Sequence, residues 1–141
     1  MTGWLLDTNV VSELRKTHPE PRIAAFIAAA ALDDLYLSEV TTAEIRFGIE
    51  RLADPLKRAA IESWLDHVLR PMFGNRILPV TEEIILRWRL MVEAGRQRHH
   101  TYSQPDLFIA ATASVRGLTV VTRIASDFDG AGVMVFDPWK Q

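Results

Sequence analysis

The sequence predicts one α/β domain over residues 1–141, with a mainly parallel central sheet of about five strands flanked by helices on both faces. Three observations predict this fold class. Short apolar runs alternate with longer segments of helical periodicity, which is the pattern of strand–helix–strand units. The helical segment 106–116 is apolar nearly all round, as expected of a helix buried inside a domain. No repeat, linker or low-complexity tract divides the chain.

The first part of the chain predicts two strands and two helices. Residues 4–6 and 35–37 are short apolar runs with the length of buried strands. The segment 22–31 places four apolar residues on one helical face: Ile23, Phe26, Ile27 and Ala30. The segment 41–53 has the same spacing at Ile45, Gly48, Ile49 and Leu52. Both segments therefore predict helices that pack one face on a sheet.

The remaining chain predicts three more helices and three more strands. The clearest helical face is formed by Ile61, Trp64, Leu65, Val68, Leu69 and Met72. The last helix ends at Gly117, because glycine readily adopts the left-handed conformation that closes a helix. The predicted elements are, in order, a helix at 56–72, a strand at 76–80, helices at 81–98 and 106–116, and strands at 118–122 and 133–136.

Composition excludes several functional classes. The absence of cysteine rules out disulfides, thiolate catalysis and cysteine-bound zinc. No apolar run approaches the roughly 20 residues of a membrane-spanning helix, and the first residues lack the pattern of a signal peptide. We therefore expect a cytoplasmic protein without a membrane partner. A net charge of −2 argues against coating nucleic acid through bulk charge, but it is compatible with a nuclease whose metal ligands are acidic.

Three carboxylates lie where the predicted strands end or the next helices begin. Asp7 closes the first strand, Glu44 lies in the first turn of the helix predicted at 41–53, and Asp106 opens the buried helix. In a doubly wound parallel sheet, the loops at the carboxyl ends of the strands gather at one edge and form the site. We therefore expect these three acids to converge.

Converging carboxylates point to a divalent cation. Acids that are crowded together raise one another's pKa unless a cation joins them. Oxygen ligands without His or Cys suit Mg²⁺ or Mn²⁺ rather than zinc. Such an ion can activate water and neutralise a phosphodiester, so few other catalytic groups are needed. The pattern favours metal-dependent phosphodiester hydrolysis.

A purely structural interpretation stays open beside this one. Thr41-x-x-Glu44 and Ser103-x-x-Asp106 both match the capping box, in which the acid satisfies backbone donors at a helix start. Asp7 fits the role of a cap after a strand.

Polar neighbours of the acids allow two interpretations as well. Thr8, Asn9 and Thr122 either orient Asp7 or a metal-bound water, or serve as turn and capping residues at strand ends.

Four stretches occur in a fixed order along the chain. They read LLDTNVVSEL from Leu5, TTAEIRFGI from Thr41, PDLFIAATA from Pro105, and VTR from Val121 with a later DF and FDPW. Together they resemble the motifs of PIN-domain ribonuclease toxins, in particular the VapC and FitB-like branch of toxin–antitoxin systems. The resemblance spans essentially the whole chain.

This resemblance implies a function and a set of ligands. Asp7, Glu44 and Asp106 would be catalytic and would bind Mg²⁺ or Mn²⁺. The implied activity is endonucleolytic hydrolysis of RNA, usually a structured RNA such as a transfer RNA. The family also implies a homodimer and inhibition by a cognate antitoxin protein.

One position departs from the family pattern. Members commonly carry Asp or Asn directly after the Thr-Arg pair, where this chain has Ile124. Asp127 lies three residues further on, in the Asp-Phe pair that is itself part of the family's closing segment, and it is a candidate ligand of a second metal ion or a group that positions the ligands. One-metal chemistry, reduced activity and a catalytically silent PIN-like binding module therefore remain open.

A phosphatase of the haloacid dehalogenase type is a competing hypothesis, since it also begins with an Asp at the end of the first strand. That class needs Asp-x-Asp, and Asn9 stands at the second position here. No suitable lysine follows a late strand either. The densest basic stretch, from Arg87 to His100, is either an RNA contact or a solvated helix face.

Overall fold

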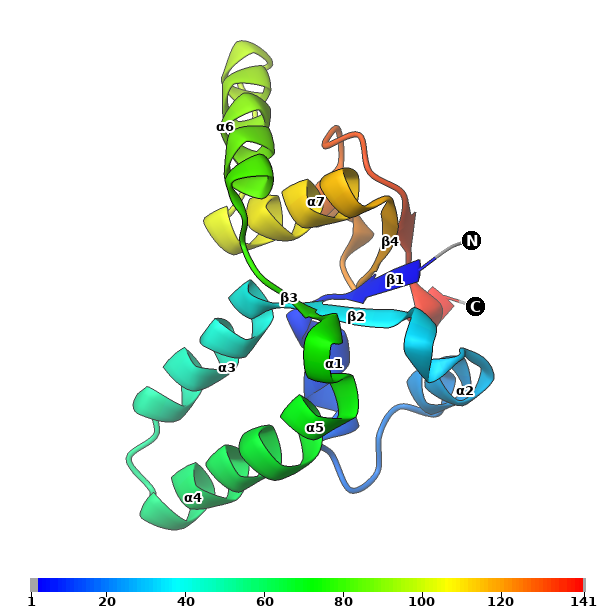
Figure 1. Cartoon of the computed structure of the whole chain (residues 1–141), viewed down its shortest axis with the longest axis vertical. Coiled ribbons are helices and arrows are strands. Elements are labelled where there is room, and N and C mark those ends of the chain that lie inside the picture. The colour runs from blue at the N-terminus through cyan, green and yellow to red at the C-terminus, as the bar shows by residue number, and fades with distance from the viewer. Residues whose placement is uncertain (1–2, 141) are drawn as a thin grey trace.

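The apolar runs of the sequence pair into one central sheet in a computed structural model that describes residues 3–140. The sheet has five strands, all neighbours run parallel, and the order from edge to edge is β3-β2-β1-β4-β5 (Figure 1). The strands are β1 Gly3–Leu6, β2 Leu35–Ser38, β3 Ile77–Leu78, β4 Leu118–Val121 and β5 Val135–Phe136. The predicted parallel sheet is confirmed.

Helices connect the strands and cover both faces of the sheet, as predicted. They are α1 Thr8–Leu14, α2 Pro21–Ala29, α3 Glu39–Glu50, α4 Pro55–Trp64, α5 Arg70–Phe73, α6 Glu82–Gln97 and α7 Gln104–Arg116. Figure 1 shows α6 and α7 on one side of the sheet and α1, α2 and α5 on the other. α3 and α4 extend from the sheet as an antiparallel helical pair.

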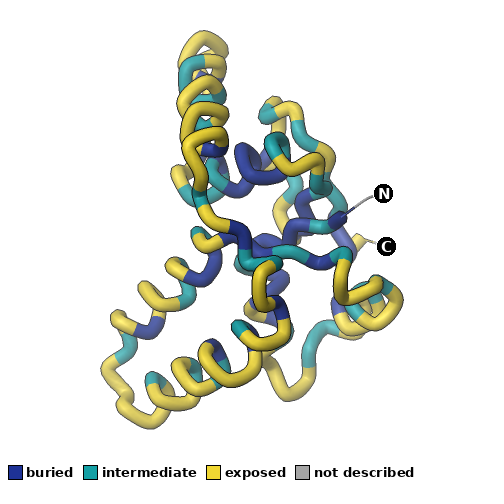
Figure 2. Tube along the Cα trace, viewed as in Figure 1, coloured by how far each residue is buried: buried dark blue, intermediate teal, exposed yellow. Residues whose placement is uncertain are grey.

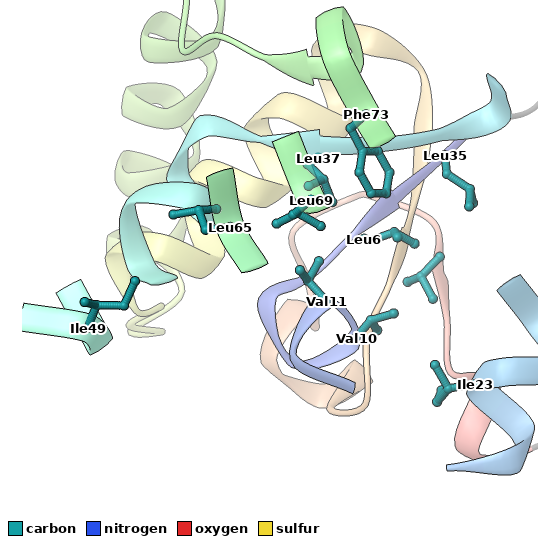
Figure 3. Close-up of a cluster of buried hydrophobic side chains, with 11 residues drawn as sticks. Leu6, Val10, Val11, Ile23, Leu35, Leu37, Ile49, Leu65, Leu69 and Phe73 are labelled. Carbon is teal, nitrogen blue, oxygen red and sulfur yellow. The ribbon is translucent and has the colours of Figure 1, made fainter. Parts of the chain in front are cut away.

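Each face of the sheet has its own hydrophobic core, because successive strand residues point in opposite directions. Leu6 and Val121 pack with α1, α2 and the segment 65–73, whereas Leu5 and Val120 pack with α7. Figure 3 shows the side chains of the first core gathered beside β1 and β2. Burial is therefore concentrated along the sheet, and the helical pair α3–α4 and helix α6 are largely exposed (Figure 2).

Helix α1 is an element that the sequence pattern did not predict. It is only seven residues long and begins with Thr8 and Asn9, polar residues that are equally typical of a turn after a strand. Its apolar face is just Val10 and Val11, which are fully buried against the sheet. The helix forms because this burial and the cap at Asp7 stabilise it, since short isolated helices are marginal in water.

The start of α3 differs from the prediction. The helix begins at Glu39 rather than at residue 41, because the Ser38 hydroxyl accepts a hydrogen bond from the Val40 N–H at 3.0 Å and caps it. Glu44 therefore lies in the second helical turn rather than the first. The capping box predicted at Thr41 and Glu44 is wrong.

The long helix predicted at 56–72 is interrupted. After α4, residues 65–69 form a π-helical turn in which the Arg70 N–H bonds the Leu65 carbonyl. Pro71 explains the interruption. Proline has no N–H to donate to the helical ladder, and its ring would clash with the carbonyl of the residue four positions earlier. Of the predicted apolar face, Leu65 and Leu69 are buried, whereas Val68 and Met72 are exposed, and the neighbouring Phe73 is buried instead.

Two predicted strands are shorter in the structure. The segment predicted at 76–80 pairs only at Ile77–Leu78, because Pro79 cannot donate to a ladder and Arg76 belongs to a 3-10 turn. The last strand covers Val135–Phe136 rather than residues 133–136. Within the described residues, no helix is long and apolar enough to cross a membrane.

Replacing Leu6 by Ala tests the core beneath β1. Leu6 is fully buried, so we expect the free energy of unfolding to fall by about 2–5 kcal/mol. Urea denaturation followed by circular dichroism measures this value. Leu56→Ala is the control, since Leu56 is 82% exposed and its truncation should change stability by about 0.5 kcal/mol or less. Equal effects of the two substitutions would contradict the assignment of the core.

Candidate active site

A polar cavity opens at the carboxyl ends of β1 and β4. Its volume is about 380 Å³, and four acidic side chains line it: Asp7, Glu44, Asp106 and Asp127. They come from four different segments, namely the β1–α1 junction, α3, the first turn of α7 and the 3-10 turn Ala125–Phe128. The structure thus brings the three acids that the sequence singled out to one cavity, together with Asp127.

Asp7 is only 6% exposed, and both of its carboxylate oxygens accept hydrogen bonds from the protein. Its Oδ1 accepts from the Thr8 N–H at 2.8 Å, and its Oδ2 accepts from the Thr122 hydroxyl at 2.9 Å. The Thr122 oxygen itself accepts from Asn9 Nδ2 and from the Ile124 N–H, both at 3.2 Å. Both acceptor positions of this hydroxyl are occupied, so its hydrogen is directed at Asp7.

Asn9 connects the β1–α1 junction to the end of β4. Its Nδ2 donates to Thr122 and, at 3.4 Å, to Asp7 Oδ2, while its Oδ1 accepts from the Arg123 N–H at 3.1 Å. The Thr8 hydroxyl lies 3.4 Å from the Thr41 hydroxyl of α3. Asn9 and Thr122 therefore contact Asp7 directly through their side chains, whereas Thr8 does so through its backbone.

Burial and mutual repulsion make ionisation of the acids unfavourable. Burial raises the pKa of Asp7, hydrogen bonds from Thr122 and Thr8 lower it, and the charges of Asp106 and Asp127 raise it further. Burial also raises the pKa of Asp106, against a lowering by the Ser103 hydroxyl, and the charge of Asp127 adds to the rise. Asp7, Asp106 and Asp127 therefore form one coupled acidic group, which a cation would stabilise.

Asp106 is also part of a helix start. Ser103 caps α7, since its hydroxyl accepts from the Asp106 N–H at 3.3 Å. This half of the predicted capping motif is confirmed, and α7 begins at Gln104, two residues before the predicted start. A helix N-terminus favours a negative charge, so the cap and an acid that faces the cavity are compatible.

Residue 127, rather than residue 124, faces the cavity. Ile124 is 48% exposed, and it precedes the 3-10 turn that carries Asp127 to the cavity wall. Phe128, next to Asp127, is buried against Ile109 and Ala110 of α7 and anchors this turn. The sequence signal for this arrangement is the Asp-Phe pair, whose apolar member fixes the acidic one.

The donor set fits a hard divalent cation. The polar side chains that line the cavity are carboxylates, hydroxyls and one amide, with no histidine, and such oxygen ligands suit Mg²⁺ or Mn²⁺. Over residues 3–140, no three acidic or histidine side chains stand close enough together to form a compact metal centre. The four carboxylates surround the cavity instead, as expected of like charges that repel one another.

A second hollow adjoins the cavity between α1, α3 and α4. It shares Thr8, Ser12 and Glu44 with the acidic cavity, so the two form a continuous depression. Its apolar wall consists of Ile45, Ile49, Leu52, Ile61 and Trp64. Glu44 therefore stands at the boundary between the acidic and apolar parts.

The basic stretch at the end of α6 does not line either hollow. Arg87 donates to the Ser114 hydroxyl at 2.7 Å, and Arg96 pairs with Glu93 at 3.0 Å. Arg98 contacts the loop after the 3-10 turn. The predicted RNA contact at this stretch stays a prediction.

Known proteins resemble this chain over nearly its whole length. The PIN domain family matches residues 4–123. Toxin FitB of Neisseria gonorrhoeae is 36% identical over 135 residues, which cover 96% of this chain and 97% of the relative. VapC ribonuclease Y4jK of Sinorhizobium fredii is 33% identical over 136 residues, with coverage of 96% and 97%. The crystal structure of FitAcB from Neisseria gonorrhoeae superposes with a TM-score of 0.90 at 36% identity and covers 98% of this chain and 99% of that one.

The raised pKa of Asp106 predicts how stability depends on pH in the absence of metal. A carboxyl whose pKa is raised by folding favours the fold while it is protonated, and this contribution is lost as pH rises through the folded pKa. Asp106→Asn cannot ionise, so its melting temperature relative to wild type should increase from pH 4 to pH 7 in chelator. Differential scanning calorimetry measures both proteins.

The exposed substitution Asp33→Asn, outside the cavity, controls for the loss of one negative charge. A difference between Asp106→Asn and wild type that stays constant with pH would show that Asp106 is not destabilised by its surroundings.

Proposed function

Because the chain belongs to the PIN-domain family, within the group of FitB- and VapC-type toxins, we propose that it is a Mg²⁺- or Mn²⁺-dependent endoribonuclease and the toxin of a toxin–antitoxin pair. The observation that carries the proposal is the cavity at the strand ends, which four carboxylates from separate segments line. The substrate would be an RNA phosphodiester, with transfer RNA as a candidate. We propose that residues 1–141 act as one domain in the cytoplasm.

Asp7, Glu44 and Asp106 are the proposed catalytic residues and metal ligands, and Asp127 is a fourth ligand. A bound divalent cation would neutralise the phosphodiester and lower the pKa of the attacking water. Asp7 presents a carboxylate whose rotation is restricted, because Thr122 and Thr8 bind its two oxygens. Asn9 and Thr122 thus act as orienting groups, a role that commonly matters for metal affinity.

The acidic side chains of the cavity also explain why an anionic substrate would need a cation there. Burial, and after it the charge of neighbouring acids, raises the pKa of Asp7 and Asp106, so the charged forms of these two groups are destabilised in the metal-free protein. A bound cation would reduce this repulsion and favour the ionised forms of Asp7 and Asp106. Because a bound metal ion would lower the pKa of the attacking water, the proposed reaction needs no side chain as general base.

The silent binding module, suggested by Ile124, is less well supported. This hypothesis rests on the absence of an acidic side chain at position 124. Asp127 supplies a carboxylate to the same cavity, and its charge acts on both Asp7 and Asp106. The segment that carries Ile124 therefore still provides one acidic side chain to the proposed site.

A cognate antitoxin is the proposed partner, together with a second copy of the chain. The hollow between α1, α3 and α4 offers an apolar wall directly beside the acids, which suits an amphipathic segment of an inhibitor. Three apolar residues of α6, Ile85, Leu86 and Leu90, are each about half exposed and are candidates for a homodimer contact.

Cleavage of RNA by purified, antitoxin-free protein tests the proposed activity. We expect cleavage with Mg²⁺ or Mn²⁺ and none with chelator. Asp7→Ala should lower the rate by roughly 100-fold or more, because a lost ligand removes several kcal/mol of charge stabilisation. Electrophoresis of a labelled transfer RNA pool measures the rate.

Glu62→Gln, an exposed change outside the acidic cavity, should keep the wild-type rate. Cleavage that persists in chelator, or in Asp7→Ala, would exclude the proposed metal site. Absence of both cleavage and Mn²⁺ binding by calorimetry would favour the silent module.

The contribution of Asp127 is tested by a pair of neighbouring substitutions. We expect Asp127→Asn to weaken Mn²⁺ binding and RNA cleavage by about 10-fold, on the scale typical of groups that support a metal site. Asp129→Asn removes the same charge two residues away, where the side chain does not line the cavity, and should have little effect. Equal effects of the two substitutions would show that Asp127 acts only through its charge and is not a metal ligand.

A further inference from the structure

We propose that Tyr102 and Arg98 are positioning residues that hold the Asp127 turn against the start of α7 and thereby set the spacing between Asp127 and Asp106. The two side chains and the backbone of Asp129 and Gly130 are called the Tyr102 clasp below. The inference rests on the proposed function, because it assigns the clasp a role in metal binding. It adds residues that neither line the cavity nor belong to the four motifs.

Three hydrogen bonds define the Tyr102 clasp. The Tyr102 hydroxyl donates to the Asp129 carbonyl at 2.8 Å and accepts from Arg98 Nη2 at 2.8 Å. The same Arg98 nitrogen donates to the Gly130 carbonyl at 3.1 Å. Tyr102 is only 9% exposed, so its hydroxyl bonds are made largely away from water, where such bonds matter most. One phenol and one guanidinium thus bind two consecutive carbonyls.

Close packing on both sides shows that the Tyr102 clasp is built into the fold. Gly130 has a φ of +76°, and a Cβ there would stand 2.2 Å from Arg98 Nη1, so only glycine lets the guanidinium approach. A Cβ on Gly95 would stand 2.9 Å from the His100 carbonyl. The His100 N–H bonds the Gly95 carbonyl at 2.8 Å, which turns the chain sharply after α6 and brings Tyr102 back against it.

The Tyr102 clasp joins the two segments that carry acidic residues. Tyr102 directly precedes Ser103, which caps α7 and bonds the Asp106 N–H. Asp129 follows Asp127 by two residues, and the two carbonyls that the clasp binds belong to the same loop. The clasp thus lies four residues from Asp106 along one segment and two residues from Asp127 along the other, so a displacement at the clasp affects both.

The Tyr102 clasp opposes the electrostatic repulsion between Asp127 and Asp106. Asp127 lies exposed on a short 3-10 turn, and its negative charge acts unfavourably on that of Asp106. Phe128 anchors the turn in the core, and the clasp fixes the chain just beyond it. Two attachments directly after Asp127 restrict this residue more than either does alone, which lowers the ordering cost when a cation binds.

Tyr102→Phe removes the hydroxyl and keeps the ring, which packs edge-on against His100 at 4.3 Å between centroids. We expect Mn²⁺ affinity, measured by calorimetry well below the melting temperature, to fall by about 3- to 10-fold, the factor of one or two lost hydrogen bonds. Amide hydrogen exchange over residues 125–131 should become faster in the metal-free protein. Tyr36→Phe is the matched control, since these are the two tyrosines of the chain and Tyr36 packs in the core away from the cavity.

Arg98→Lys provides a second variant that acts from the other donor and leaves Tyr102 intact. It should weaken Mn²⁺ binding and loosen the same segment, because a single ammonium does not reproduce the fork of the guanidinium. Wild-type affinity and exchange in both variants would overturn the inference, even where Asp127→Asn lowers the affinity and so upholds the metal site. Failure of the wild-type protein itself to bind Mn²⁺ would overturn the proposed function, and the inference with it.

Discussion

The backbone pairing of β1 with β4 runs over four residue pairs, from Gly3 opposite Leu118 to Leu6 opposite Val121. Both strands therefore end at the same level, and the Asp7 N–H continues the ladder by bonding the Val121 carbonyl at 2.9 Å. Thr122 is thereby placed beside the Asp7 carboxylate, although 115 residues separate them in sequence. A slip of one residue in this register would turn Leu5 and Leu6 to the wrong cores and separate the two polar groups.

The acidic side chains line one cavity at the carboxyl ends of the strands, where their charged forms are destabilised and hydrogen bonds partly offset this effect. Burial and mutual repulsion raise the pKa of Asp7 and Asp106, while hydrogen bonds from Thr122, Thr8 and Ser103 act in the opposite direction. The acids belong to four different segments: the β1–α1 junction, α3, α7 and the 3-10 turn that carries Asp127. Such a tension between local stability and function is typical of sites that await a cation or substrate.

The two sides of the sheet contribute differently. The side with α1, α2 and α5 buries the larger core and supports Asp7 through Val10 and Val11. The side with α7 supplies Asp106 and, through Phe128, anchors the turn of Asp127. α3 carries Glu44 from the cavity toward the apolar hollow. The acidic cavity thus lies where elements from both layers meet, beyond the carboxyl ends of the strands, as the rule for parallel sheets requires.

The sequence by itself determined the parallel α/β fold, most of its helices and the three acids Asp7, Glu44 and Asp106, because periodicity and the positions of strand ends are local properties of the chain. It missed α1, whose seven residues depend on packing, and it misplaced the start of α3, where Ser38 and residue 41 are equally good caps by type. Only the tertiary structure decided that Asp127 faces the cavity while Ile124 does not, and that Thr122 and Asn9 both bind Asp7. These outcomes depend on contacts between segments far apart in the chain, which no local pattern records.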